Sequence, residues 1–266
     1  MTQIEQLAEE LISCANVTDQ RVVVLIYGPP GSGKSTVAEK LVELINRNTI
    51  DVPAINCSTS KPFKVYTGFG GTQTQICEYR NEPISNENKI PAAIHLKMDG
   101  FHLPLAKLTN ELITRRGCHE SFDSKLVVRL CELLANNEWS SLSIPDFDHQ
   151  KKDPVNPGIR LNAASKIVVF EGLYLMLDVP PWNDIPKMVS ELKGDKYPIK
   201  VVKINGGDTN ELAERVAKRH YNCGLVKSYE EGLERYYAND IHNANLVISN
   251  SIESLTDYVV DNTKHI

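Results

Sequence analysis

The most constraining feature of the sequence is a short glycine-rich segment, Gly28-Pro-Pro-Gly-Ser-Gly-Lys34-Ser35. It has the spacing G-x-x-x-x-G-K-[S/T]. Glycines let backbone N–H groups turn inward to form a concave anion site, and a helix that follows offers its positive N-terminus to the same site. The pattern therefore predicts a loop that binds nucleotide phosphates.

The flanking residues supply the structural context that such a loop needs. Residues 22–27, Val-Val-Val-Leu-Ile-Tyr, form a continuous apolar run that is typical of a parallel strand buried on both faces. Beyond the loop, apolar residues recur at helical spacing from Ala38 to Ile45. Lys34 is placed to reach the β- and γ-phosphates of ATP, and the Ser35 hydroxyl to bind Mg²⁺. The predicted ATP-binding residues are Gly28, Pro29, Pro30, Gly31, Ser32, Gly33, Lys34, Ser35 and Thr36.

Strand and helix patterns alternate along the rest of the chain. Apolar periodicity predicts helices at residues 4–15, 124–135, 182–192 and 209–220. A further helix from Ser228 to about Tyr237 is expected, and Asp208 with Glu211 has the spacing of a capping box. Buried strands are expected at residues 94–98, 166–170 and 199–204, with a weaker candidate at 246–248. The alternation predicts an α/β fold of the P-loop NTPase type, with a parallel sheet flanked by helices.

Two segments stand apart within what we expect to be a single domain, residues 1–266. Residues 52–91 lack helical periodicity and contain the turn-like Thr67-Gly-Phe-Gly-Gly71, so they predict a small inserted β-rich hairpin or cap. Residues 208–238 are expected to form a lid region, with Cys223-Gly224 as its hinge.

Composition narrows the choice of partners. Asp and Glu together number 34 and Lys and Arg 29, so the formal net charge is −5, and no long run of like charges occurs. Nucleic acids and anionic membranes need a basic surface, which argues against both. No apolar run approaches the roughly 18 residues of a membrane span, and the 6 cysteines lack metal-ligand spacing. We therefore expect a cytoplasmic protein with reduced thiols.

Two acids directly follow predicted strands. Asp99 follows residues 94–98, and Glu171 follows residues 166–170; each precedes a glycine. Ligands of open parallel sheets bind at the carboxyl ends of the strands. Transfer of a phosphoryl group to a hydroxyl needs one carboxylate to accept the hydroxyl proton and another near Mg²⁺, so both acids are candidate site residues rather than turn formers.

Five ordered motifs resemble the uridine kinase, phosphoribulokinase and pantothenate kinase group, and especially fungal P-loop kinase-like proteins of that group. The likeness extends from about Val22 to Asn250. Besides the phosphate loop, the motifs are Met98-Asp-Gly-Phe-His102, Arg115-Arg-Gly117 with Ser121-Phe-Asp123, Pro145-Asp-Phe-Asp-His149 with Asp153-Pro154, and Glu171-Gly-Leu-Tyr-Leu175.

The resemblance implies roles for several of these residues. Asp99 matches the catalytic base of the group, and Glu171 matches its acidic residue near Mg²⁺. It also implies an acceptor pocket lined by Arg115, Arg116 and His149. His102 is a further candidate for contact with the substrate, although as isolated histidines His102 and His149 equally fit hydrogen-bonded structural residues. One departure is that Cys118-His119 stands where the fungal relatives commonly carry a proline two residues after Arg-Arg-Gly, which leaves the shape of this loop and the acceptor open.

Arg215 and Arg219 lie four residues apart, so they share one helix face. Spacing alone favours a solvated face on which Glu211 pairs with Arg215. The resemblance instead implies a lid helix whose arginines close over ATP and stabilise charge on the transferred phosphoryl group.

The function expected from these features is ATP- and Mg²⁺-dependent phosphoryl transfer to a hydroxyl of a small metabolite, such as a nucleoside, a sugar or sugar acid, or a pantothenate-like alcohol. A regulatory P-loop ATPase acting through a protein partner is the alternative. The base-reading motif of GTPases, Asn-Lys-x-Asp, is missing, since Asn88-Lys89 continues with Ile90 and Pro91. A degenerate kinase fold that only binds a partner is disfavoured by the presence of Lys34, Ser35, Asp99 and Glu171.

Overall fold

A five-stranded parallel sheet forms the centre of the protein, in the order β11-β10-β1-β9-β6. The computed structural model describes residues 1–55, 61–136, 138–193 and 198–263. The five strands are β1 (Val22–Tyr27), β6 (Ala93–Lys97), β9 (Ile167–Glu171), β10 (Ile199–Asn205) and β11 (Tyr258–Asp261). Because β1 lies in the middle, the loop that follows it leaves from the centre of the sheet. The predicted P-loop NTPase-type fold is confirmed.

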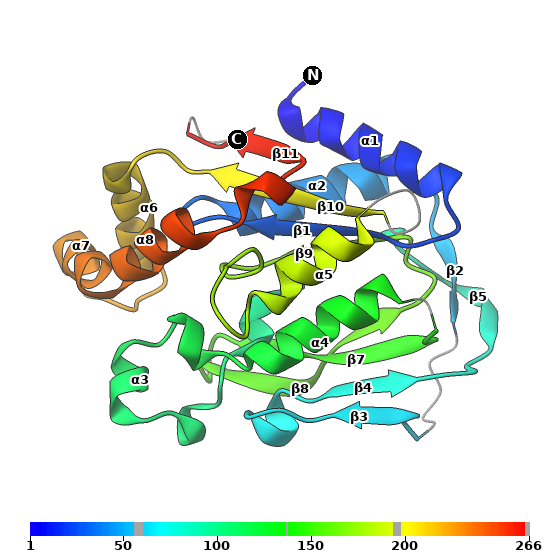
Figure 1. Ribbon diagram of the computed structural model, residues 1–266, viewed down its shortest axis with the longest axis horizontal. Helices are drawn as coiled ribbons and strands as arrows, with labels where there is room; N and C mark the ends of the chain where they lie inside the picture. The colour runs from blue at the N-terminus through cyan, green and yellow to red at the C-terminus, as the bar shows by residue number, and fades with distance from the viewer. Residues whose placement is uncertain (56–60, 137, 194–197, 264–266) are drawn as a thin grey trace.

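Helices cover both faces of this sheet (Figure 1). Side chains of β1 alternate between the two resulting cores: Val22, Val24 and Ile26 pack with one group of helices, and Val23, Leu25 and Tyr27 with the other. The first group consists of α1 (Gln3–Val17) and α2 (Lys34–Asn48), and the second of α4 (Ser124–Ala135) and α5 (Asp184–Leu192). Burial on both faces explains why β1 reads as an unbroken apolar run.

A second, antiparallel sheet lies beside the central one, in the order β3-β4-β7-β8. Its strands are β3 (Lys64–Tyr66), β4 (Ile76–Tyr79), β7 (Ser141–Asp148) and β8 (Asp153–Asn162). A two-stranded sheet pairs β2 (Val52–Ile55) with β5 (Ile84–Ile90). The segment 52–91 is therefore β-rich, but half of the larger sheet comes from the hairpin β7–β8. The sequence did not indicate that hairpin, because it contains Pro145, Pro154 and Pro157 and prolines are unusual inside strands.

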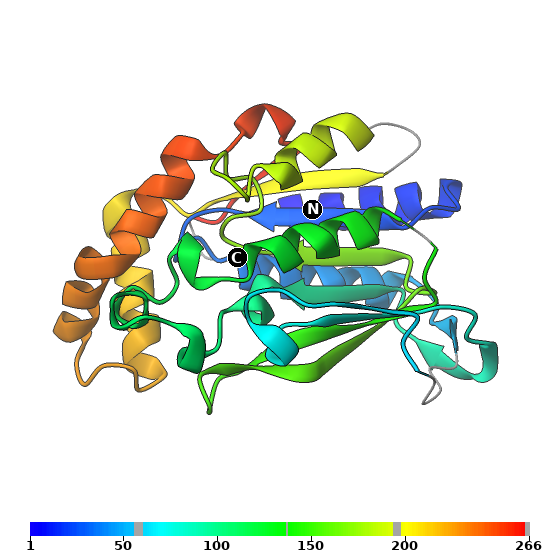
Figure 2. The same cartoon turned by 60° about the horizontal axis from the view of Figure 1, so that its bottom comes forward.

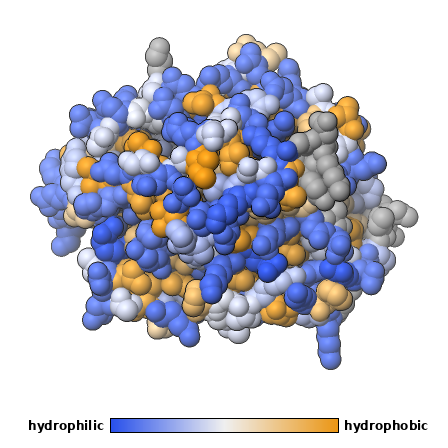
Figure 3. Space-filling model, viewed as in Figure 1, coloured by the Kyte–Doolittle hydropathy of each residue, from blue (hydrophilic) through white to orange (hydrophobic). Residues whose placement is uncertain are grey.

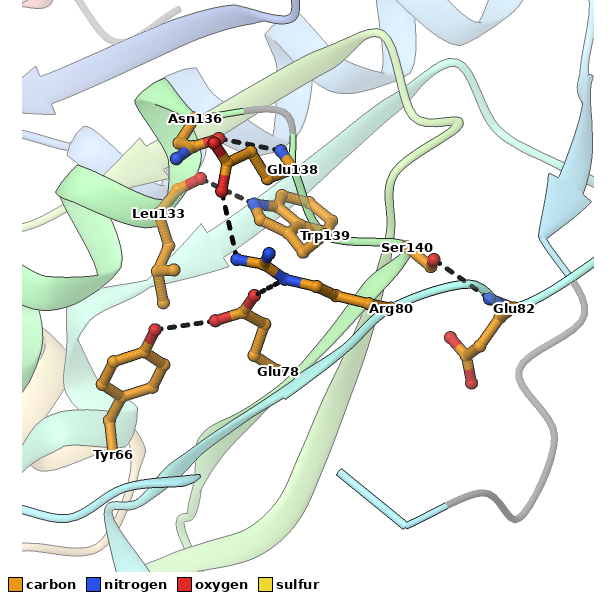
Figure 4. A network of polar contacts seen from close by, with 9 residues as sticks. All are labelled: Tyr66, Glu78, Arg80, Glu82, Leu133, Asn136, Glu138, Trp139 and Ser140. Atoms are coloured by element: carbon orange, nitrogen blue, oxygen red, sulfur yellow. Dashed lines mark hydrogen bonds and ion pairs between the residues drawn. The ribbon is translucent and has the colours of Figure 1, made fainter. Parts of the chain in front are cut away.

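A polar network links β3 and β4 to the loop between α4 and β7 (Figure 4). The carboxylate of Glu78 is 1% exposed and accepts hydrogen bonds from Tyr66 Oη at 2.7 Å and from Arg80 Nε at 2.5 Å. Burial, together with the hydrogen bond and charge of Glu78, raises the pKa of Tyr66 to about 12. Arg80 also pairs with Glu138, at 3.1 Å, on the loop before β7. A buried carboxylate with two donors thus ties β3 and β4 together.

The predicted lid region is a chain of helices at one end of the molecule. Residues 208–238 form α6 (Thr209–Asn222), α7 (Tyr229–Arg235) and the start of the π-helical turn η5 (Tyr236–Asp240), and α8 (Ile241–Asn250) follows directly. The expected capping box of Asp208 and Glu211 is present. A small core of Leu212, Ala213, Val216 and Tyr236 holds these helices together. They lie at the same end of the molecule as α3 (Asn110–Thr114), as both ribbon views show (Figures 1 and 2).

Short 3-10 helices complete the described structure. They are η1 (Gly71–Gln73), η2 (Met98–Phe101), η3 (Leu105–Lys107), η4 (His119–Ser121) and η6 (Glu253–Leu255). Of these, η2 matters most here because it carries Asp99 away from the end of β6.

The weaker strand candidate at residues 246–248 is wrong. These residues lie in α8, where Val247 is buried and Ile248 is 51% exposed, as expected on a helix surface. Three apolar residues are too few to distinguish the two periodicities. The fifth strand is β11 instead, with a buried Val260.

The tryptophans, the cysteines and the surface show no further special feature in the described part of the chain. The tryptophans at positions 139 and 182 are packing residues, 3% and 0% exposed. The cysteines 14, 77, 118, 131 and 223 carry free thiols, whereas Cys57 lies outside the described residues. In the described ranges, no helix has the length and apolar character required to cross a membrane. The face shown in Figure 3 is predominantly hydrophilic with scattered apolar side chains.

Replacement of Glu78 by alanine is expected to lower the free energy of unfolding by about 2 kcal/mol, because Arg80 Nε and Tyr66 Oη both lose their hydrogen-bond acceptor. Glu138→Ala is the matched control: it removes the other partner of Arg80, but its side chain is 64% exposed, so we expect less than about 1 kcal/mol. Urea denaturation of both variants measures the difference. Equal losses would contradict the role assigned to the buried carboxylate.

Candidate active site

The loop after β1 is held in a tight space that excludes side chains. A Cβ atom on Gly28 would lie 2.7 Å from the carbonyl oxygen of Ile204 in β10, and one on Gly31 would lie 2.8 Å from that of Leu212 in α6. Gly33, with φ 90°, precedes the first residue of α2. The glycines thus allow the loop to lie against β10 and α6 with its backbone in conformations that other residues rarely adopt.

Lys34 lies within this loop. Its Nζ donates to the carbonyl oxygen of Pro29 at 3.0 Å. Burial lowers the pKa of Lys34 to about 8; the charge of Arg219 acts in the same direction, while those of Glu171 and Asp99 oppose it. An ammonium group in such a position gains a strong partner when phosphate oxygens replace the carbonyl.

Ser35 and Glu171 meet where the loop joins the end of β9. Ser35 Oγ donates to Glu171 Oε1 at 2.7 Å, and His95 Nε2 lies 3.6 Å from the same oxygen. Burial raises the pKa of Glu171, but His95, Lys34 and Ser35 together outweigh it, so its pKa is below the usual 4.5. The carboxylate is therefore ionised at neutral pH.

The donor set of this pair fits magnesium. A hydroxyl oxygen and a carboxylate oxygen are ligands that Mg²⁺ prefers, and it commonly completes its coordination with water and substrate phosphates. Within the described residues, no cluster of three or more His, Cys, Asp or Glu side chains could hold a metal unaided. Ser35 and Glu171 suit an ion that arrives with a nucleotide.

Asp99 lies at the same edge of the sheet, on η2. β6 pairs with β9, and β9 pairs with β1, so Asp99 is separated from the phosphate loop by the end of a single strand. Its side chain is exposed, and its charge acts on Lys34 and His102. The next residue, Gly100, packs on β7: a Cβ there would lie 2.3 Å from the carbonyl oxygen of Pro145. The antiparallel sheet therefore borders the predicted base.

His102 is packed against aromatic side chains beside Asp99. Its ring centroid lies 4.0 Å from that of Phe122 and 5.0 Å from that of Phe147. Its Nδ1 is 2.9 Å from the main-chain oxygen of Asp99. Burial lowers the pKa of His102, against the opposing charge of Asp99. The imidazole is therefore fixed in orientation and mainly neutral at pH 7.

Residues 109–121, which we call the acceptor loop, contain Arg115 and Arg116. These two arginines differ in their hydrogen-bond partners. Arg116 Nη2 pairs with Asp153 at 3.0 Å and donates to the carbonyl of Leu103 at 3.1 Å, and Nη1 donates to that of Lys152. Its guanidinium is thus occupied by protein groups. Of the nitrogens of the Arg115 guanidinium, only Nε hydrogen-bonds to a residue that the structure describes: it donates to Asn239 Oδ1 at 2.8 Å.

His149 and the Cys118-His119 departure lie at the edges of this region. His149 is exposed after β7, with its ring 5.3 Å from Phe147. Cys118 is buried, and its main-chain N–H closes a turn onto the carbonyl of Arg115 at 2.9 Å. His119 lies 3.2 Å from Glu120. A compact 3-10 turn therefore follows Gly117 without the proline.

The lid arginines do not form the solvated pair that spacing alone favoured. Glu211 is used in the cap of α6, and Arg215 Nη2 donates to the carbonyl of Thr263 at 2.9 Å. No ion pair of Arg215 occurs in the part of the chain that the structure describes. Arg219 is exposed, and its charge acts on Lys34 and on Asp240. The face of α6 that carries Arg219 thus lies near the phosphate loop.

Several residues of the site were not indicated by the sequence. His95 lies inside a run of residues that the sequence indicates only as a buried strand. A titratable histidine within such an apolar run is the signal that could have singled it out. Tyr174 holds the acceptor loop by donating to the carbonyl of Gly117 at 2.7 Å. Asn239 and Thr263 act through contacts 124 and 48 residues away in sequence, which no local pattern reveals.

Comparisons with known sequences agree with this geometry. The ATP-dependent kinase YFH7 of Candida glabrata is 28% identical over 343 residues, which cover 96% of this chain and 97% of that protein. The crystal structure of YFH7 from Saccharomyces cerevisiae, described as a P-loop containing kinase with a circular permutation, has a TM-score of 0.75 at 26% identity and covers 98% of both chains. Over nearly its whole length, this chain is thus related to the P-loop kinases of the fungal YFH7 group.

More distant similarities concern the fold or a part of it. A Silicibacter protein named as a fructose transport system kinase has a TM-score of 0.69 at 20% identity, covering 97% of this kinase and 99% of that chain, so it shows the shared fold alone. The Sigma-54 interaction domain family matches residues 1–70 of the kinase. That stretch contains β1, the glycine-rich loop and α2.

The buried amine of Lys34 makes ATP binding by this kinase sensitive to alkaline pH. Its pKa of about 8 must rise when phosphates bind, because they favour the ammonium form. Affinity is therefore full below about pH 7 and weakens above pH 8; the dissociation constant should be about tenfold larger at pH 9 than at pH 7. Isothermal titration calorimetry measures this change. Lys34→Arg is the control: arginine stays charged from pH 7 to pH 9, so ATP affinity should no longer depend on pH. An ATP affinity of the unmodified protein that does not change with pH would contradict the role given to the Lys34 amine.

Proposed function

We propose that this kinase transfers the γ-phosphate of ATP to a hydroxyl group of a small metabolite. The observation that carries the proposal is the shared edge of the central sheet. There the phosphate loop follows β1, Glu171 is the last residue of the neighbouring β9, and Asp99 follows β6 on the other side of β9. A nucleotide bound in the loop would lie between this edge and α6, with Asp99 exposed beside it.

The proposed reaction is a direct in-line transfer. The acceptor hydroxyl oxygen forms a bond to the γ-phosphorus while the bond from that phosphorus to the β–γ bridging oxygen breaks, and ADP leaves. Asp99 accepts the proton of the hydroxyl. Lys34, Arg215 and Arg219 stabilise the negative charge of the phosphates, and the lid excludes water.

Magnesium would be held by Ser35 and Glu171 together with the nucleotide, and when bound it supplies charge neutralisation at the phosphates. The pair at 2.7 Å supports this assignment, because both oxygens already converge on one point at the phosphate loop. His95, 3.6 Å from the same carboxylate, contributes to the lowered pKa of Glu171 and so favours its ionised form.

The acceptor pocket is proposed to lie between η2, the acceptor loop and the β7–β8 hairpin. His102 and Arg115 remain the strongest candidates for contact with the acceptor, since one is fixed beside Asp99 and the other has its terminal nitrogens available. Arg116 serves to hold the loop in place through Asp153. His149 is accessible at the end of the hairpin.

Two substitutions test the assigned roles. Lys34→Ala is expected to abolish transfer and ATP binding, because it removes the buried cation of the phosphate loop. Asp99→Asn keeps the size of the side chain but cannot accept the proton, so turnover should fall by about 100-fold or more while ATP affinity changes little. Equal losses of ATP affinity in both variants would contradict the separation of roles.

The acceptor itself is testable with [γ-³²P]ATP. The enzyme is incubated with nucleosides, sugars, sugar acids and pantothenate-like alcohols in turn, and labelled products are separated by chromatography. Label is expected on one of these classes. Hydrolysis that responds to a protein partner and to no small hydroxyl compound would instead identify a regulatory ATPase.

A further inference from the structure

The π-helical turn η5 joins the acceptor loop to the lid. α7 runs directly into η5 and then into α8, without an intervening loop. A π-helical turn contains one extra residue, which rotates the side chains that follow, and such turns are frequent at functional sites. Two consecutive residues of this turn, Asn239 and Asp240, face different parts of the active site.

Asn239 faces the acceptor loop. Its Oδ1 accepts from Arg115 Nε at 2.8 Å, and its Nδ2 lies 3.5 Å from the carbonyl oxygen of Arg116. Asn239 is 6% exposed, so this amide is withdrawn from water. One turn later, the amide of Asn243 lies 3.9 Å from the position that a Cβ of Gly117 would occupy. The side of the helix that bears these amides therefore forms a wall of the loop.

The next residue, Asp240, is within electrostatic reach of Arg219 in α6 and Arg235 in α7. The charges of Arg219 and Arg235 act on its carboxylate and oppose burial, which nevertheless raises the pKa of Asp240. Its Oδ2 and Arg235 Nε are both buried and make no hydrogen bond within the described ranges. Arg219 acts on Lys34 as well. η5 also packs against the helix that carries Arg219, because Tyr236 shares a buried core with Leu212, Ala213 and Val216 of α6.

The hydrogen bond to Asn239 leaves Arg115 suited to a ligand. Nε is occupied, whereas Nη1 and Nη2 make no hydrogen bond or ion pair to any residue that the structure describes. These two nitrogens can bind an oxygen group in bidentate fashion. Arg116, one residue further on, offers no such edge because protein oxygens occupy both of its terminal nitrogens.

We propose that Asn239 is a positioning residue that orients Arg115 toward the acceptor and, through η5, couples the acceptor loop to the lid arginines. Movement of Arg219 toward bound phosphates changes the surroundings of Asp240, and Asn239 transmits that change to the loop. The inference rests on the proposed nucleotide site and deepens it, since it adds a residue that acts on both substrates without contacting the reacting atoms.

Hydrogen exchange with mass spectrometry tests this coupling without knowledge of the acceptor. The probe is the non-hydrolysable ATP analogue AMP-PNP with Mg²⁺, and the readout is the exchange rate of peptides covering residues 109–121. AMP-PNP is expected to slow exchange in this loop by about fivefold or more in the unmodified kinase. In Asn239→Ala the protection should fall below about twofold, while the dissociation constant of AMP-PNP changes by no more than about twofold.

Three further variants make the result specific. Asn239→Asp keeps an oxygen acceptor for Arg115 Nε and should restore the protection. Arg115→Ala removes the same hydrogen bond from a half-buried side chain and should lose it, even if Asn239→Ala fails to fold. Asn250→Ala is the matched control. The side chain of this exposed asparagine of α8 donates to the carbonyl oxygen of Leu246 in the same helix at 3.1 Å, so the variant should behave as the unmodified kinase does.

The outcomes separate the two proposals. Absence of AMP-PNP binding to the unmodified kinase would overturn the proposed function and this inference with it. Binding without protection of the loop, or protection in Asn239→Ala and Arg115→Ala equal to that in the unmodified kinase, would overturn the coupling alone. Loss of protection in Asn250→Ala to the same extent would likewise overturn it, because the effect would then not depend on the contact with Arg115.

Discussion

The whole site depends on the parallel pairing of β6, β9 and β1. Parallel strands end at the same edge of a sheet, and β1 can occupy the middle only because both of its faces are buried under helices. This pairing brings the glycine-rich loop, Glu171 and Asp99 together although about 140 residues separate the first from the second. The chemistry of the individual residues is ordinary; their convergence is a property of the sheet.

The nucleotide side of the site could be predicted from sequence because its signals are local. The loop is contiguous, and each of its residues has a fixed relation to β1 and α2. Glu171 and Asp99 could be placed at strand ends because apolar runs precede them. The short β11 carries only three apolar residues before Asp261, and α8 has an equally short run, so periodicity could not separate strand from helix there.

The acceptor side could not be predicted to the same depth, because its geometry comes from contacts between distant segments. Adjacent arginines read alike in the sequence, yet Arg116 is bound by Asp153 and main-chain oxygens while Arg115 is held at Nε alone. The β7–β8 hairpin, which borders Asp99, could not be predicted because its strands contain prolines, which are unusual inside strands. Resemblance to known kinases selected these stretches for the acceptor pocket, which stays a prediction, and the structure is needed to separate residues that hold the loop from residues that face outward.

The contact of Gly31 with α6 limits how this kinase can open. The carbonyl oxygen of Leu212 lies only 2.8 Å from the position that a Cβ of Gly31 would occupy, so the first turns of α6 are in direct contact with the phosphate loop. Gly224, with φ +69°, follows the other end of the same helix. We therefore expect the predicted lid to pivot at this distal glycine, so that the contact between the phosphate loop and α6 is kept while a nucleotide enters.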